Sequence, residues 1–243
     1  MTGSKLTEKI LYLPKRAVLK IEDLLYLSLT KAKSYLPTNI KMPFQVIFVP
    51  VEKINKIVVS QDQLGRRKKF LVSHKRVIGS IKGGDWDLHT VMFEDSIDML
   101  SIKQRYLEGK NWEETDYFQK FNHEFEYPLN HLGETWTRGA ESWSEYRENY
   151  LKKIDYIFND MKENEYKTQN ELGGRAEKEI EVAISRNKEV LFIDGRHRLA
   201  MAKVLGVEYV PCIVNVWHEK IIKDHSAFNL VPSEIITKIG GFR

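Results

Sequence analysis

The chain has 243 residues, 42% hydrophobic and 30% charged, a composition typical of a soluble folded protein that excludes long intrinsic disorder. Its formal charge of +4 is a small excess spread along the sequence, which permits nucleic-acid binding without indicating it. The single cysteine, Cys212, excludes an intramolecular disulfide and a cysteine-cluster metal site, and no apolar run approaches the roughly 20 residues that cross a bilayer, so a cytoplasmic protein is expected.

The first part of the chain predicts a helix followed by strands. Apolar residues at near-helical spacing in 5–36, with basic residues between them, predict an amphipathic helix that caps the core or lies on an anionic membrane or a partner. The apolar runs 44–49 and 54–59 predict two strands. The basic run from Arg66 to Lys69 predicts either a solvated hairpin tip or a contact to a phosphate backbone.

A strand at 77–82 then leads into an unusual loop, Gly83–Asp87, which we call the acidic loop. Paired glycines permit close backbone approach, and Asp85 and Asp87 point to the same side if the loop is extended. These two carboxylates are therefore candidate catalytic acids. The alternative is a structural loop in which Trp86 fills a core pocket and the two acids cap a following helix.

Residues 95–147 predict helices rich in aromatic side chains, which at this spacing form a core more often than a base-stacking surface. Asn111 and Glu114 are spaced like the two partners of a capping box. A further amphipathic helix is predicted from Tyr150 to about Glu163.

The last part of the chain predicts strands at 179–184 and 190–193, then a polar turn, a helix at 199–205 and a strand at 210–216. A tail follows, 226–243, which is expected to pack on the domain. The polar turn is the most informative stretch of the chain, and we call it the basic turn; its residues are Asp194, Gly195, Arg196, His197 and Arg198.

A helix N-terminus presents unpaired N–H groups and a partial positive charge, so the basic turn can hold a phosphate or a carboxylate. Three basic residues at this end oppose the helix dipole by a few tenths of a kcal/mol each, unless an anion is bound. All five residues of the turn are therefore candidate phosphate ligands. The alternative is a structural turn in which Asp194 caps the helix and His197 makes a structural hydrogen bond, and His218 at a strand end is expected to be structural as well.

The order strand, turn, strand, basic turn, helix and strand resembles the ParB/sulfiredoxin superfamily over residues 150–218, and more loosely over 77–87. The resemblance implies an α+β fold with a mixed sheet. It divides the chain into an N-terminal helical and strand extension (1–72), a ParB/sulfiredoxin-like domain (73–225) with a helical insertion at 95–147, and the C-terminal tail.

Three branches of the superfamily differ at the basic turn. Sulfiredoxins have a catalytic cysteine where this chain has Arg196, and partitioning proteins continue into helix-turn-helix and dimerisation regions, for which the 25 residues after His218 leave no room. The free-serine kinase branch fits best, because Asp194, Gly195, His197 and Arg198 match its motif.

This resemblance implies an ATP- or ADP-dependent phosphotransferase, a kinase that acts on a small hydroxyl-bearing molecule. Asp194 would bind Mg²⁺, Asp85 or Asp87 would take the proton of the acceptor hydroxyl, and His197 would assist the transfer.

Two other functions stay open from the sequence. One is a nucleic-acid-binding or nuclease protein of the ParB-like class, to which the run from Arg66 to Lys69 would contribute. The other is a nucleotide-sensing regulator without turnover, in which 95–147 forms a partner surface. The sequence identifies neither the acceptor, the preferred nucleotide nor the oligomeric state.

Overall fold

The structure is a computed structural model that describes residues 40, 42, 44–58, 78–126, 140, 142–224 and 232–238. The expected helix at 5–36, the basic run from Arg66 to Lys69 and much of the expected tail lie outside these residues. Within the described part, no helix has both the length and the apolar character needed to cross a membrane.

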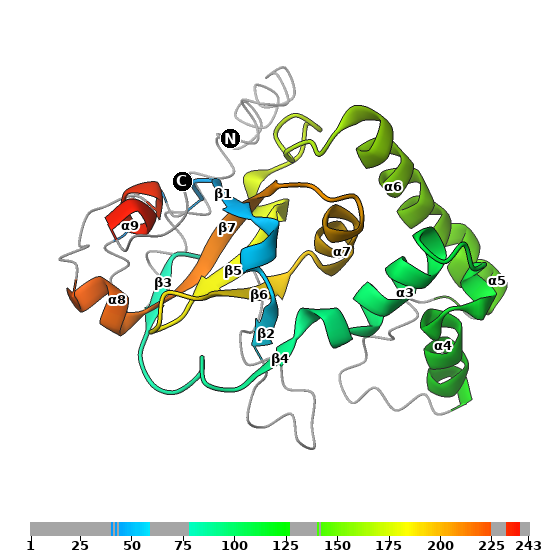
Figure 1. The fold of residues 1–243 in the computed structure, drawn as a ribbon, viewed down its shortest axis with the longest axis horizontal. Coiled ribbons are helices and arrows are strands. Elements are labelled where there is room, and N and C mark those ends of the chain that lie inside the picture. Colours follow the sequence, from blue (N-terminus) through cyan, green and yellow to red (C-terminus); the bar gives the residue numbers. More distant parts are fainter. Residues whose placement is uncertain are drawn as a thin grey trace, which may run out of the picture.

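A mixed sheet forms the centre of the fold (Figure 1). The strands run in the order β1-β7-β5-β6-β2-β4, and β3 pairs with β7 outside this path. Pairs β2/β6, β3/β7 and β5/β7 are parallel, whereas β1/β7, β2/β4 and β5/β6 are antiparallel. The seven described strands are β1 (Ile47–Pro50), β2 (Lys56–Val58), β3 (Ser80–Lys82), β4 (Thr90–Met92), β5 (Ile180–Ile184), β6 (Val190–Asp194) and β7 (Tyr209–His218).

The mixed sheet with surrounding helices confirms the expected α+β class. Strands β1 and β2, from the first 72 residues, pair directly with β7 and β6, so they belong to the same sheet as the later strands. Strand β4 is an element that the hydrophobic pattern did not predict.

The central strand β5 is buried along its whole length. The pairing of β5 with each neighbour shifts in register at nearly the same point. The shift lies between Glu181 and Val182 in the pairing with β6, and between Val182 and Ala183 in the pairing with β7. Glu181 is buried as well, because the side-chain amide of Asn215 on β7 donates a hydrogen bond to its carboxylate. The period-two pattern of this segment therefore predicts the strand correctly but not the burial of both its faces.

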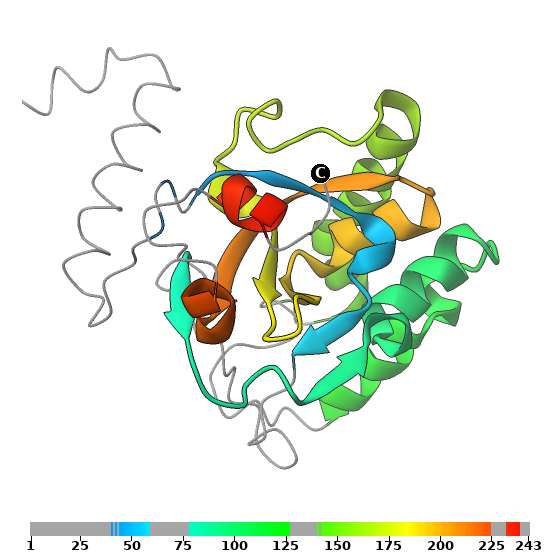
Figure 2. The same cartoon turned by 60° about the vertical axis from the view of Figure 1, so that its left-hand side comes forward.

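Helices group on two sides of the sheet, as Figures 1 and 2 both show. One group includes the helices of the expected insertion and the helix that follows the basic turn, and α8 packs against β3 and β7. The described helices are α3 (Ile97–Tyr106), α4 (Asp116–Glu126), α5 (Trp143–Tyr146), a π-helical turn at Arg147–Leu151, α6 (Lys152–Asn164), α7 (Arg196–Val204), α8 (Glu219–Asp224) and α9 (Pro232–Lys238). Short 3₁₀ turns lie at Val51–Lys53, Phe93–Asp95, Trp112–Glu114 and Ala176–Lys178.

Aromatic residues of the insertion form a core, as their spacing predicts. Trp112, Tyr117 and Tyr146 are buried, and the ring of Tyr106 stacks on Phe158 of α6 with 3.6 Å between centroids. The expected capping contact is also present, since the backbone N–H of Asn111 donates to the Glu114 carboxylate at 2.8 Å, although it opens a 3₁₀ turn.

Asp155 on α6 joins three parts of this helical layer. Its carboxylate accepts hydrogen bonds from the Tyr106 hydroxyl at 2.7 Å, the Trp112 indole at 3.0 Å and the Arg105 guanidinium at 3.2 Å. Burial and the bond to Asp155 both raise the pKa of Tyr106, so this phenol remains a donor at neutral pH.

We expect Asp155→Ala to lower the free energy of unfolding by about 1–3 kcal/mol, because it leaves half-buried donors without their acceptor. Urea unfolding followed by circular dichroism would measure the loss. Asp160→Ala on the same helix is the control, since Asp160 pairs with Asn164 and Lys167 near the surface. Equal losses for the two variants would show that Asp155 is not the link described above.

Candidate functional site

The basic turn begins where β6 ends and α7 starts. Gly195 adopts a φ of 93°, and a side chain there would place its Cβ only 3.1 Å from the Cα of Ile180 on β5, so glycine is required for both reasons. The Asp194 carboxylate accepts the backbone N–H of Gly195 at 2.8 Å. Asp194 therefore does not cap α7, whose first turn has no side-chain cap and no acidic residue.

His197, in this first turn, is surrounded by groups from the helical layer. Its Nε2 lies 2.6 Å from the Tyr117 hydroxyl and 3.2 Å from Oδ1 of Asp98. The Tyr150 hydroxyl lies 3.1 Å from its Nδ1 and 3.4 Å from its Nε2. We call Asp98, Tyr117, Tyr150 and His197 the His197 network.

The positions of protons in this network follow from which groups can donate and which can only accept. The Tyr117 hydroxyl lies 2.6 Å from Asp98, and it must donate its one proton there because an ionised carboxylate only accepts. His197 Nε2 must then carry a proton of its own, which it shares with Tyr117 and Asp98. The Tyr150 hydroxyl lies near both ring nitrogens, slightly closer to Nδ1.

Asp98 remains ionised although its side chain is only 9% exposed. Burial alone would raise the pKa of this carboxyl, but the hydrogen bond from His197 and the charge of Arg196 outweigh burial and lower the pKa well below its usual range. Burial and the neighbouring Asp98 charge raise the pKa of Tyr117 well above its usual value, so this phenol stays protonated.

Arg196 and Arg198 differ in their surroundings. The Arg196 side chain is 45% exposed and reaches Asp98 at 3.4 Å. Arg198 instead binds the buried Glu179 carboxylate at 3.1 Å and donates to the carbonyl of Lys178. In this structure Arg196 is therefore the cation of the turn that faces solvent, whereas Arg198 anchors the turn to the start of β5.

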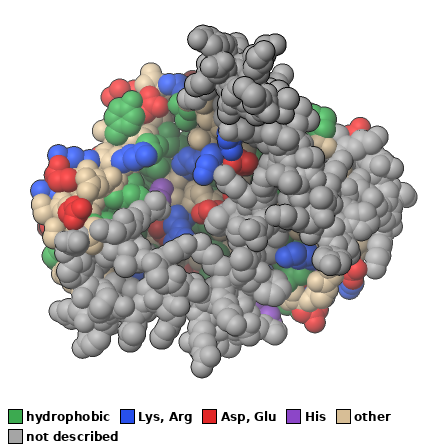
Figure 3. Space-filling model, turned by 180° about the vertical axis from the view of Figure 1, so that it is seen from behind, with side chains coloured by type: hydrophobic (Ala, Val, Ile, Leu, Met, Phe, Trp, Pro, Cys, Tyr) green, Lys and Arg blue, Asp and Glu red, His purple; other side chains and the backbone are tan. Residues whose placement is uncertain are grey.

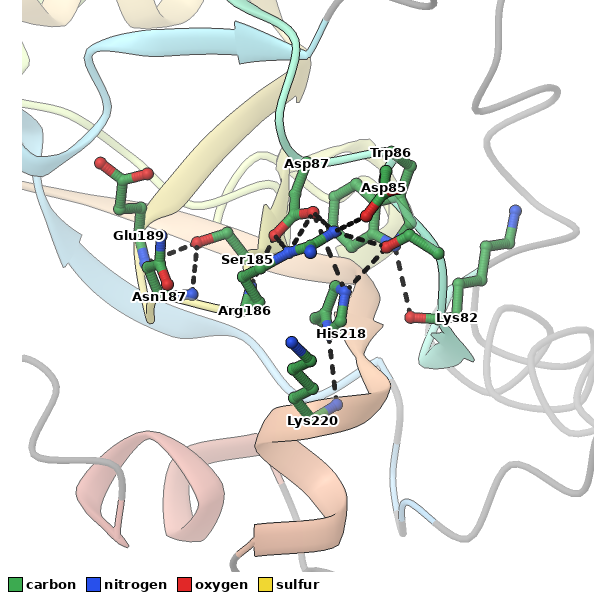
Figure 4. Close-up of polar contacts among 11 residues, drawn as sticks. Lys82, Asp85, Trp86, Asp87, Ser185, Arg186, Asn187, Glu189, His218 and Lys220 are labelled. Atoms are coloured by element: carbon green, nitrogen blue, oxygen red, sulfur yellow. Dashed lines mark hydrogen bonds and ion pairs between the residues drawn. The ribbon is translucent and has the colours of Figure 1, made fainter.

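The candidate acids Asp85 and Asp87 occupy a different cluster, with Arg186 and His218, which we call the Arg186 cluster (Figure 4). Asp87 accepts the backbone N–H of Arg186 at 2.7 Å and its guanidinium at 2.7 to 3.1 Å. The Arg186 guanidinium also donates to the Gly84 carbonyl at 2.6 Å and to Asp85 at 2.8 Å.

His218 closes the same cluster. Its Nδ1 accepts the backbone N–H of Lys220 at 3.2 Å, so its Nε2 carries the proton that is donated to the Gly84 carbonyl at 3.1 Å. Trp86 is buried against Ala183 on the sheet. These contacts agree with the structural interpretation of His218 and Trp86, but the two acids hold Arg186 instead of capping a helix.

The strand register separates the two sets of candidate residues. Gly195 lies against Ile180 at the start of β5, whereas Arg186 follows Ile184 at its end. The four residue steps between Ile180 and Ile184 span about 13 Å at about 3.3 Å per residue. The structure therefore does not bring Asp85 or Asp87 to the basic turn, because these carboxylates lie at the opposite end of β5.

The carboxylate that contacts Arg196 and His197 is Asp98, which sequence reasoning missed. It stands two residues after Ser96, whose side chain caps α3 by accepting the Met99 N–H at 3.2 Å. An acid in the first turn of a helix is common for electrostatic reasons, so nothing local marks it as a site residue. Tyr150 carries a clearer structural signal, because it lies in the π-helical turn, a feature frequent at functional sites.

A metal could be held at the basic turn only with help from a ligand. No group of three or more His, Cys, Asp or Glu side chains suited to a metal ion occurs among the described residues. Asp194 supplies one carboxylate beside the helix N-terminus, which suits Mg²⁺ when phosphate oxygens and water complete its coordination.

Seen from behind, basic, acidic and histidine side chains gather near the middle of the described surface (Figure 3).

Comparison with known proteins identifies no relative of this chain: no family model, curated protein or solved structure matches it. The interpretation of the site depends on its own geometry.

The close fit of Gly195 against β5 predicts a specific loss of stability. Gly195→Ala should cost about 1–2 kcal/mol for the left-handed backbone and more for the contact with Ile180. Gly206→Ala is the matched control, because Gly206 has a φ of 69° but no atom within 4 Å of the added Cβ. Urea unfolding would compare them, and an equal cost would contradict the importance of the Ile180 contact.

The Arg186 cluster predicts a pH-dependent stability. Asp87→Asn should lower the free energy of unfolding at pH 7 by up to about 3–5 kcal/mol, since it leaves Arg186 without its buried partner. Burial would raise the pKa of Asp87, but hydrogen bonds from Arg186 lower it below the ordinary 3.8. The Asp87 contribution is then complete above pH 3.8 and is lost as the pH falls through the lower folded pKa.

Urea unfolding across this acid range would measure the effect, and the difference between the wild type and Asp87→Asn should shrink there. The control is Asp85→Asn, because the Asp85 side chain is 69% exposed and its loss should cost less than about 1 kcal/mol. A difference that stayed constant with pH would exclude Asp87 as the titrating group.

Proposed function

We propose that this protein is a nucleotide-binding member of the ParB/sulfiredoxin-like class, an ATP- or ADP-dependent phosphotransferase acting on a small hydroxyl-bearing molecule. One observation carries the proposal: His197, in the first turn of a helix that opens with Gly195 and a solvent-facing Arg196, contacts the buried carboxylate of Asp98 on α3. A phosphate site and a proton acceptor thus lie side by side.

Phosphate recognition is assigned to the basic turn. The first N–H groups of α7 have no intrahelical acceptor, and no acidic side chain lies in its first turn to compete with an anion. The Arg196 guanidinium can make charge-assisted hydrogen bonds to phosphate oxygens and neutralise the charge that develops on them during transfer. Asp194 would share a nucleotide-bound Mg²⁺ with those oxygens.

We assign the role of proton acceptor to His197, because Asp85 and Asp87 do not lie at the basic turn. A hydroxyl that attacks a phosphorus atom gives up its proton, and a neutral imidazole is suited to receive it. The ionised Asp98 orients the ring through Nε2 and stabilises the positive charge that the ring then carries.

Arg196→Ala should weaken ATP and ADP binding by about tenfold or more, because a hydrogen bond to a charged group contributes about 1.5–3 kcal/mol. Calorimetric titration with each nucleotide, with and without Mg²⁺, would measure this change. Lys152→Ala is the control, since Lys152 is exposed on α6 and pairs with Glu148 on the surface. Its affinity should equal that of the wild type.

Wild-type protein that bound neither nucleotide nor inorganic phosphate would overturn the proposal. Salt-sensitive binding to DNA in place of nucleotide would favour the nucleic-acid function, and nucleotide binding without transfer to any hydroxyl compound or water would favour the regulator.

A further inference from the structure

We propose that Tyr117 is a positioning residue, whose hydroxyl fixes the His197 ring against the buried carboxylate of Asp98. This role rests on the proposed phosphotransfer and adds to it the group that holds the proton acceptor in place. It follows from three short distances that join these side chains.

The Tyr117 hydroxyl lies between the other two groups. It is 2.6 Å from Nε2 of His197 and 2.6 Å from Oδ1 of Asp98. The direct distance between Nε2 and the same carboxylate oxygen is longer, 3.2 Å. Of the two partners of Nε2, the phenol is therefore the closer and makes the stronger hydrogen bond.

A phenol can bridge a carboxylate and an imidazole because its hydroxyl both donates and accepts. The Tyr117 proton is donated to the ionised Asp98, and the Tyr117 oxygen accepts the proton that Nε2 of His197 carries. Burial and the Asp98 charge raise the pKa of Tyr117, so the phenol keeps its proton and both bonds at neutral pH.

Asp98 alone would hold the ring less firmly, because its carboxylate is shared. Its second oxygen, Oδ2, lies 3.4 Å from the Arg196 guanidinium, which is the group of the basic turn assigned to phosphate. A phosphate that draws Arg196 away therefore changes the surroundings of this carboxylate. Tyr117 is 0% exposed, so its contact with the ring is remote from that exchange of partners.

Local structure places the phenol accurately. Tyr117 is the second residue of α4, and the start of this helix is clamped to α3 by Gln104. The Gln104 amide donates to the Asp116 carboxylate at 3.0 Å, and its carbonyl oxygen accepts the backbone N–H of Asp116 at 2.9 Å. The ring of Trp112 packs beside Tyr117, with 5.9 Å between centroids. Because Asp98 also lies on α3, this clamp fixes the phenol relative to the carboxylate.

Tyr117→Phe removes one oxygen and keeps the ring. The rate to be measured is phosphate release from ATP, in which water takes the place of the unidentified acceptor. We expect kcat to fall about 10²-fold, the cost of a small misplacement of a catalytic group. The nucleotide affinity should stay unchanged, because Arg196 and the first N–H groups of α7 remain.

Tyr106→Phe is the matched control. The Tyr106 hydroxyl also donates to a carboxylate of the same helical layer, that of Asp155 at 2.7 Å. Both variants should lose stability in urea, and only Tyr117→Phe should lose turnover. An equal loss of turnover in the two would show that Tyr117 acts through the fold alone and would overturn its positioning role.

A double-variant cycle tests whether Tyr117 acts through His197. Tyr117→Phe should lower the rate of the wild type and cause no further loss in His197→Ala, because the group that it positions is already absent. The same fold-change in both backgrounds would contradict an action through His197.

¹⁵N NMR of the ligand-free protein supplies a measurement that needs no nucleotide. The neutral His197 ring should carry its proton on Nε2, with a ¹H signal that two buried acceptors protect from exchange with water. This signal should be lost through exchange in Tyr117→Phe and kept in Tyr106→Phe. A proton on Nδ1, or a signal that survives in Tyr117→Phe, would overturn the role.

Failure of the positioning role and failure of the proposed function are distinguishable. Absence of nucleotide binding overturns the function, and the NMR result then decides the role of Tyr117 by itself. An unchanged kcat in Tyr117→Phe, with nucleotide still bound, overturns the positioning role alone.

Discussion

The buried carboxylate of Asp98 is the constraint on which the candidate site depends. An ionised group at this depth is stable only with partners that compensate for lost hydration. Asp98 finds them in Tyr117 of α4 and in Arg196 and His197 of α7, and so its own helix, α3, becomes electrostatically joined to the turn beyond β6. The helical insertion is thus part of the site.

The two polar clusters of the protein illustrate opposite uses of charge. In the Arg186 cluster, the backbone and side chain of Arg186 donate to Asp87, Asp85 and the Gly84 carbonyl, which ties the acidic loop to the β5–β6 hairpin. The His197 network instead leaves a solvent-facing Arg196 and a ring nitrogen opposite a partly exposed phenol. A closed cluster stabilises a loop, whereas an incomplete one is suited to binding and chemistry.

Much of the framework could be predicted from the sequence, because strands and helices leave local patterns. The strand before the basic turn, the helix that ends just before Gly206 and the aromatic core around Trp112 all follow from spacing and turn chemistry. The partner of His197 could not be found in this way. Asp98 lies almost a hundred residues earlier, and only tertiary packing of α3 on α7 brings the two together.

The error over Asp85 and Asp87 has a related cause. Both the acidic loop and the basic turn follow strands of one sheet, and similar surroundings suggested a common site. Strand direction separates the two loops. Strand β6 runs antiparallel to β5, whereas β7 runs parallel to β5 and β3 runs parallel to β7. The loops that follow β3 and β6 therefore lie at opposite ends of the strands of the sheet. Hydrophobic periodicity does not reveal strand direction.

The paired register shifts beside β5 have a consequence for the position of the site. Each neighbour of β5 carries one extra residue at the same level, so Ile193 and Asn215 act as spacers in β6 and β7. Despite the extra residue, Asp194 stays opposite Glu181 and Val216 stays opposite Ala183, so the residues after each shift keep the same face as their partners on β5. Asp194, the first residue of the basic turn, is therefore held by its pairing with Glu181, and the bulge in β6 sets where this turn leaves the sheet.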